Sequence, residues 1–157
     1  MKISGRTDIG APIDFVFGFL SDFDGWERAA LRRGADVTRT DKLRKPGAGM
    51  TWHVRFAWKG RERELQIKVV KLDPAGQMTL SFDGPAIEGT LNAELVSLAS
   101  KRTRLLAQVE AKPRTLAARL FIQSLKLAKS RVQKRYDARL DQLARDIEIR
   151  QGAGGQA

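Results

Sequence analysis

The longest regular pattern in the chain lies between Lys112 and Arg150, which read KPRTLAARLFIQSLKLAKSRVQKRYDARLDQLARDIEIR. Apolar residues recur here in steps of three and four, the spacing of one helix face. This stripe consists of Ala118, Phe121, Leu125, Ala128, Val132, Tyr136, Leu140, Leu143 and Ile147. Pro113 can open such a helix and Gly152 lies just past its end. We predict one helix of about 36 residues, roughly 54 Å long, whose apolar side another part of the chain must cover.

The two halves of this predicted helix differ in the width of the apolar stripe. Leu116, Leu120 and Leu127 widen it in the first half only, whereas the second half is narrow and highly charged. We therefore expect residues 118–132 to cover the rest of the domain and the part from Lys134 onward to overhang it. The domain should span residues 1–150, and the Gly- and Gln-containing residues 151–157 should form a disordered tail.

The segments before the helix predict a curved sheet and two short helices. Residues 2–9 alternate as a strand does. Pro12 can open a helix over 13–20, and Ser21 or Asp22 can cap a second helix that reaches about Leu31. Six further strands, separated by turn signals, are predicted over residues 35–43, 50–58, 61–72, 77–83, 87–98 and 103–111. Seven strands joined mostly by hairpins predict an antiparallel sheet with one apolar face, in an α+β fold.

Composition excludes several classes of site. The 157 residues include no cysteine and one histidine, which excludes disulfides, thiolate metal sites and multi-histidine metal sites. No apolar run is long enough to span a membrane, and the first residues lack a signal-peptide core. We expect a cytoplasmic protein, soluble or peripherally bound to a membrane.

Positive charge gathers toward the carboxyl terminus. Of the net charge of +11, residues from Pro113 onward carry +6. Such a helix attracts polyanions, so an anionic membrane surface or a nucleic acid is a candidate partner. The alternative is a solvated basic surface without a specific partner.

The titratable residues predict no catalytic group. His53 alternates away from the apolar face of its strand, Asp22 is better explained as a helix cap, and Glu62 and Glu64 belong to a solvated row. We predict no catalytic residue, no metal site and no cofactor.

The start of the chain carries a family resemblance. Ile9-Gly10-Ala11-Pro12, followed by the aromatic-rich residues 15–23, resembles the strand-to-helix junction of the START-like (SRPBCC) superfamily, which includes polyketide cyclases and lipid-transfer proteins. The order of strand, two short helices, six strands and long helix is similar to the helix-grip (Bet v 1-like) arrangement of that superfamily.

A narrower resemblance, to the G-type accessory protein of carbon monoxide dehydrogenase, lies in four segments: Gly60-Arg61, Asp73-Pro74, Ile87-Glu88-Gly89 and residues 116–129. The chain departs from that type before the last helix, where residues 111–115 replace a glycine-rich segment. We therefore carry over neither cofactor insertion nor membrane recruitment from that type.

The superfamily resemblance implies a cavity between the sheet and the long helix that holds a small hydrophobic or amphipathic ligand, such as a lipid, a polyketide or an isoprenoid-like molecule. The alternatives are a cyclase or dehydrase enzyme and a basic protein that binds an anionic membrane, RNA or the ribosome. The candidate ligand-binding residues are Trp52, Val54, Phe56, Trp58, Leu80, Phe82, Leu91, Leu105, Phe121 and Leu125. The same residues could instead fill a solid core.

Overall fold

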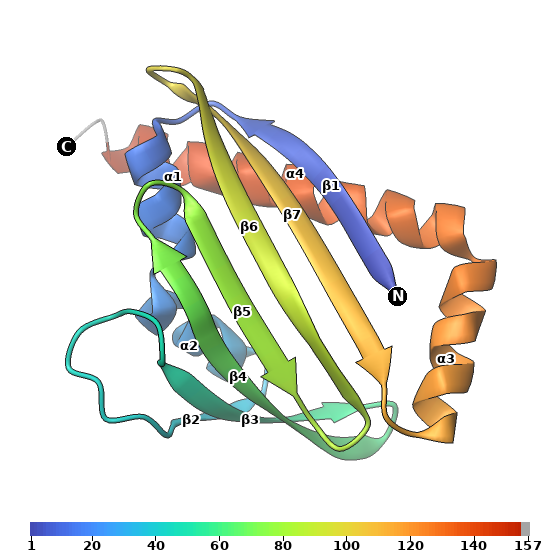
Figure 1. The fold of residues 1–157 in the computed structure, drawn as a ribbon. Helices are drawn as coiled ribbons and strands as arrows, with labels where there is room; N and C mark the ends of the chain where they lie inside the picture. The colour runs from blue at the N-terminus through green and yellow to red at the C-terminus, as the bar shows by residue number, and fades with distance from the viewer. Residues whose placement is uncertain (155–157) are drawn as a thin grey trace.

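The computed structural model describes residues 1–154 and contains one antiparallel sheet with four helices (Figure 1). The strands are β1 (Lys2–Ile9), β2 (Asp36–Arg39), β3 (Thr51–Trp58), β4 (Arg61–Asp73), β5 (Gln77–Asp83), β6 (Ile87–Ala99) and β7 (Arg102–Pro113). The helices are α1 (Ile13–Leu20), α2 (Phe23–Arg32), α3 (Leu116–Leu127) and α4 (Lys129–Gly154). The predicted α+β class, the seven strands and the two short helices are confirmed.

The sheet order is β1-β7-β6-β5-β4-β3-β2, with every neighbouring pair antiparallel. Strands β3 to β7 follow one another through hairpins, and β1 closes the far edge by pairing with β7. Figure 1 shows α1, α2 and α4 behind the curved sheet, on its concave side. This is the helix-grip arrangement predicted from the order of elements.

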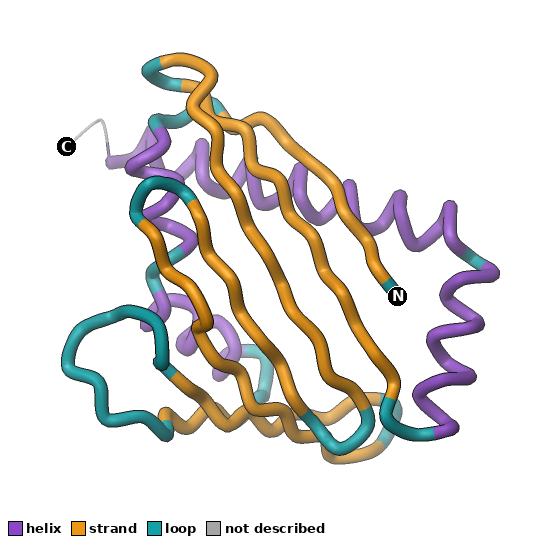
Figure 2. The backbone as a smooth tube through the Cα atoms, in the orientation of Figure 1, coloured by secondary structure: helices purple, strands orange, loops and turns teal. Residues whose placement is uncertain are grey.

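The predicted long carboxy-terminal helix is confirmed as α4. The prediction that it runs unbroken over residues 112–150 is wrong, because the chain breaks at Ala128 (Figure 2). Pro113 ends β7, and α3 begins only after Thr115, whose Oγ1 accepts a hydrogen bond from the Ala118 amide at 3.1 Å. Ala128 has ψ of 31°, outside the helical range. Neither proline nor glycine stands at the break, so no local signal predicts it.

The distribution of burial between the two halves is the reverse of the prediction. In α3 only Ile122 is buried, and Leu116, Leu120 and Leu127 are 70%, 57% and 92% exposed. In α4, Leu140, Ala144 and Ile147 are buried. The reason is the break, at which α3 turns away from the axis of α4 (Figure 1). The extra leucines of α3 are therefore exposed, while the narrower stripe of α4 packs on the sheet. Helix α4 continues to Gly154, and the rest of the expected disordered tail, residues 155–157, lies outside the described residues.

Helix α4 is held tightly against β1. A Cβ atom on Gly5 would lie 2.9 Å from Asp137 Oδ1 and 3.1 Å from Leu140 Cδ1, so glycine permits this close approach. Thr7 Oγ1 donates to Asp141 Oδ1 at 2.9 Å. Because α4 sits over the β1 edge, the middle of the concave face is left for a cavity.

Candidate functional site: two cavities on the concave face

A cavity of about 410 Å³ lies between the concave face of the sheet, α2 and α4. Of its nineteen lining residues, only Glu27 carries a charge. The sheet contributes alternate residues from β2 to β7, because every second side chain of a strand points to the same face. The hollow is therefore an apolar chamber of a size common for small-molecule sites.

The polar hydrogens at this chamber are already bonded within the protein. Trp52 Nε1 donates to Glu27 Oε1 at 2.5 Å, and the Tyr136 hydroxyl donates to the Ala107 carbonyl at 2.5 Å. Burial raises the pKa of the Tyr136 phenol, and the nearby Asp137 carboxylate raises it further. The chamber thus offers a guest mainly apolar contacts, with the free oxygens of Glu27 and Tyr136 as acceptors.

A second cavity, about 770 Å³, lies where the β3–β4 hairpin faces the first turns of α3. Trp58 and Phe121 meet edge to face there, with ring centroids 5.2 Å apart. Its lining includes the charged residues Arg55, Lys59, Glu62, Arg63 and Glu64. We call the first cavity the apolar chamber and the second the hairpin cavity.

The two cavities follow each other along β3. Trp52 and Val54 line the apolar chamber, and Phe56 and Trp58, the next residues on the same face, line the hairpin cavity. From Val54 to Trp58 is four residues, about 13 Å along a strand. The two cavities share no lining residue; we refer to them together as the trough, with the apolar chamber at one end and the charged hairpin cavity at the other.

Eight of the ten predicted ligand-binding residues line this trough. Those at the apolar chamber are Trp52, Val54, Leu80, Leu91 and Leu105, and those at the hairpin cavity are Phe56, Trp58 and Phe121. Trp52 and Leu105 belong to the buried core and also line the chamber, so the same side chains pack the core and border the cavity.

The other two predicted residues, Phe82 and Leu125, line neither cavity. The Phe82 ring covers Gly89 on the neighbouring strand so closely that a Cβ on that glycine would clash with its Cζ. Leu125 is half-buried on α3, which the break has turned away from the chamber.

Sequence reasoning missed Glu27, Lys59 and Arg63 as lining residues. The signal for Arg63 is present, because the period of two that places Leu65 inward also places Arg63 inward. Glu27 carries no such signal, since its position depends on how α2 packs against Trp52.

Two interpretations of titratable residues are confirmed by the geometry. His53 lies on the outer face, with Nε2 3.2 Å from Glu64 Oε2 on β4. Asp22 caps α2, its Oδ1 accepting from the Gly25 amide at 3.2 Å. Both are explained by local structure.

The family model described as polyketide cyclase/dehydrase and lipid transport matches residues 1–148. The chain belongs to this family. The resemblance to the START-like superfamily indicated by the sequence is confirmed. The family with this fold binds small hydrophobic ligands. No curated protein sequence matches the chain. The narrower resemblance, to the G-type accessory protein of carbon monoxide dehydrogenase, stays a prediction.

Solved structures share the fold of this family member at low identity. The Zhui aromatase/cyclase from Streptomyces sp. R1128 aligns with a TM-score of 0.68 and 15% identity, covering 96% of this chain and 94% of that one. A START superfamily protein from Mycobacterium smegmatis gives 0.56 and 12%, covering 90% and 98%. Norcoclaurine synthase from Thalictrum flavum, solved with dopamine and hydroxybenzaldehyde, gives 0.61 and 12%, covering 80% and 76%. These likenesses concern the fold alone.

Residues 1–154 include no helix that is both long enough and apolar enough to cross a membrane.

Proposed function

We propose that the protein binds and carries a small hydrophobic or amphipathic ligand in the apolar chamber. The observation that carries this proposal is a hollow of about 410 Å³ whose nineteen lining residues include a single charged side chain. A solid core would close such a space, because unfilled apolar volume destabilises a protein. Membership of a family described by cyclase, dehydrase and lipid-transport activities supports the same proposal.

The test is to fill the chamber and compare binding. Val54 is half-buried and lines the chamber, whereas Val96 on β6 is 39% exposed and lines neither cavity. Val54→Trp should weaken binding of the neutral fluorescent probe N-phenyl-1-naphthylamine by about tenfold or more, since it removes both space and apolar contact. Val96→Trp is the matched control and should bind as the wild type does.

Native mass spectrometry and solvent extraction of the purified protein give a second measurement. The expected result is a co-purifying small molecule that Val54→Trp loses and Val96→Trp keeps. Absence of both a co-purifying molecule and probe binding would contradict the proposal.

A second candidate function is cyclase or dehydrase chemistry on the bound ligand. One observation favours it, namely that a carboxyl group, Glu27, and a phenol, Tyr136, both line the chamber. A side chain must lie within hydrogen-bond reach of a ligand to act as acid or base, and a ligand that fills the chamber would contact both of these side chains. Cyclisation of a linear poly-β-ketone, abolished in Glu27→Gln without loss of probe binding, would support the enzyme. Unchanged turnover in Glu27→Gln would contradict it.

A third candidate is contact with an anionic membrane through α3. Leu116, Leu120 and Leu127 fall on one exposed face of this helix, with Arg119 and Lys126 beside them. Exposed leucines flanked by basic residues are typical of helices that lie on anionic lipid surfaces. Vesicles containing phosphatidylserine should bind the protein at low salt and bind Leu120→Ser/Leu127→Ser less. Equal binding of both proteins would contradict this role, and RNA binding in the same buffer would indicate a nucleic-acid partner instead.

A further inference from the structure

The inward side of β4 changes from apolar to basic toward the β3–β4 hairpin. Val69, Ile67 and Leu65 point to the concave face, and Arg63 is the next residue on that face. Arg63 pairs across the sheet with Phe56, and both line the hairpin cavity. A charged side chain directed into the concave side of a ligand-binding fold calls for a functional explanation.

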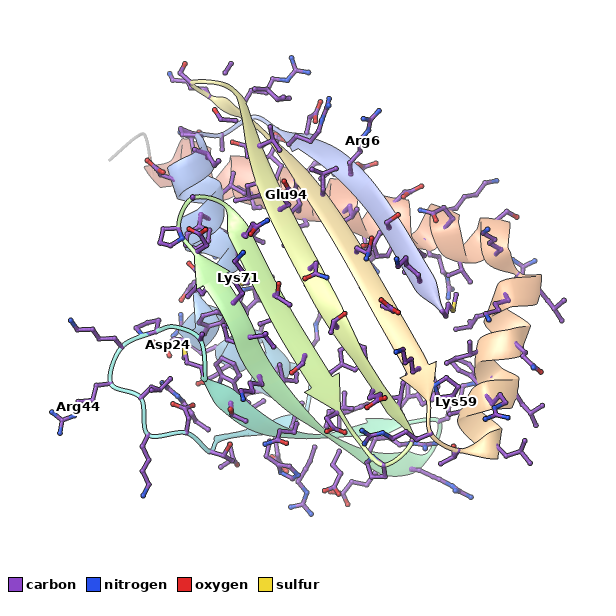
Figure 3. The ribbon with its side chains drawn as sticks, in the orientation of Figure 1. Arg6, Asp24, Arg44, Lys59, Lys71 and Glu94 are labelled. Carbon is purple, nitrogen blue, oxygen red and sulfur yellow. The ribbon has the colours of Figure 1, made fainter. Side chains whose placement is uncertain are left out.

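Lys59 joins Arg63 at the same cavity. It occupies the turn between β3 and β4 with φ of 51°, a left-handed conformation uncommon for lysine. Its Nζ lies 4.8 Å from the Trp58 ring centroid and 4.3 Å from that of Phe121. The Arg63 guanidinium lies 5.5 Å from the same Trp58 ring. Lys59 therefore makes cation–π contacts with both aromatic rings, and Arg63 makes one with Trp58. Figure 3 labels Lys59 where the hairpin meets α3.

These two residues, the cationic pair, lack an anionic partner within residues 1–154. The carboxylates that line the cavity are engaged elsewhere: Glu62 Oε1 lies 3.2 Å from Arg55 Nε, and Glu64 Oε2 lies 3.2 Å from His53 Nε2. Neither member of the cationic pair forms a salt bridge with any described residue. In addition, Arg63 Nε is the one buried side-chain polar atom in the described residues without a hydrogen-bond partner. A buried donor of this kind is costly unless something accepts from it.

We infer that the hairpin cavity binds the anionic head group, a carboxylate or a phosphate, of an amphipathic ligand whose tail occupies the apolar chamber. This rests on the proposed ligand-binding function and specifies the class of ligand. The spacing suits such a molecule, because Val54 of the apolar chamber and Trp58 of the hairpin cavity lie about 13 Å apart along β3, a span that an extended alkyl chain can bridge. Guanidinium and ammonium groups make strong, charge-assisted hydrogen bonds to oxyanions. A cationic head group would meet repulsion from the cationic pair instead.

The experiment compares four ligands that share one alkyl chain: laurate, lauryl phosphate, lauryl alcohol and dodecyltrimethylammonium. Each competes with N-phenyl-1-naphthylamine for wild-type protein and for K59Q/R63Q. The matched control is K42Q/R44Q, which removes a lysine and an arginine from the exposed loop between β2 and β3, where Figure 3 labels Arg44. Thermal unfolding verifies that all three proteins are folded.

The wild type should bind laurate, lauryl phosphate or both at least about tenfold more tightly than lauryl alcohol, as expected for one or two charge-assisted hydrogen bonds. K59Q/R63Q should lose this preference while its affinity for lauryl alcohol changes less than about twofold, and K42Q/R44Q should keep it. The relative affinities of laurate and lauryl phosphate identify the head group.

Two results overturn the inference, and they differ from failure of the proposed function. If lauryl alcohol binds as tightly as the anions, or if K59Q/R63Q keeps the preference, the head-group site is refuted while ligand binding stands. If none of the four compounds and no neutral probe binds the wild type, the proposed function itself fails.

Discussion

Replacing Ile147 by alanine tests which helix is buried against the sheet. Ile147 on α4 is 0% exposed, whereas Ile149, two residues later on the same helix, is 70% exposed. Ile147→Ala removes three carbon atoms, worth about 2.4 kcal/mol of transfer free energy at ~0.8 kcal/mol each. The cavity left behind adds to this, so the free energy of unfolding should fall by about 2 to 5 kcal/mol. Ile149→Ala removes the same atoms from a surface that is mostly solvated, and should cost about 0.7 kcal/mol or less.

Urea unfolding followed by circular dichroism measures these differences. With a slope of about 2 kcal/mol per M, Ile147→Ala should lower the urea midpoint by roughly 1 to 2.5 M, while Ile149→Ala leaves it nearly unchanged. Leu127→Ala serves as the control on α3, where the leucine is 92% exposed, and should change stability by less than about 0.5 kcal/mol. If Leu127→Ala destabilises as much as Ile147→Ala, then α3 covers a core and the burial assigned to the two helices is wrong.

Three further predictions concern single contacts. Tyr136→Phe loses the hydrogen bond to the Ala107 carbonyl and should lower the unfolding free energy by about 1 kcal/mol in urea titrations; no change would show that the bond contributes nothing. Asp41 has a lowered pKa, chiefly through its hydrogen bond from Arg39, so its contribution is present above pH ~4 and is lost as the pH falls further. The stability difference between wild type and Asp41→Asn should therefore be largest at pH 7 and shrink at pH 3, and a constant difference would contradict the assignment. Gly89→Ala would put a Cβ against the Glu110 carbonyl oxygen of β7, so it should distort the sheet and lower the thermal midpoint measurably, whereas an unchanged midpoint would refute that contact.

The break at Ala128 illustrates a limit of periodicity. A continuous apolar stripe is compatible with one straight helix, and no proline or glycine interrupts it. The break turns α3 toward the β3–β4 hairpin, where Phe121 packs on Trp58, a contact between residues far apart in the sequence. Local propensity is weak compared with such packing, so the pattern alone could not place the turn.

The sequence alone determined the strands, the two short helices and the inward residues, since a period of two assigns each strand residue to one face regardless of its neighbours. That is why seven of the eight proposed lining residues that lie on strands line the two cavities. Only the tertiary structure decided which helix covers the sheet, that Glu27 reaches Trp52, and that Lys59 and Arg63 share the Trp58 ring without a carboxylate partner among the described residues. These features depend on distances between separate elements, which the order of residues along the chain does not specify.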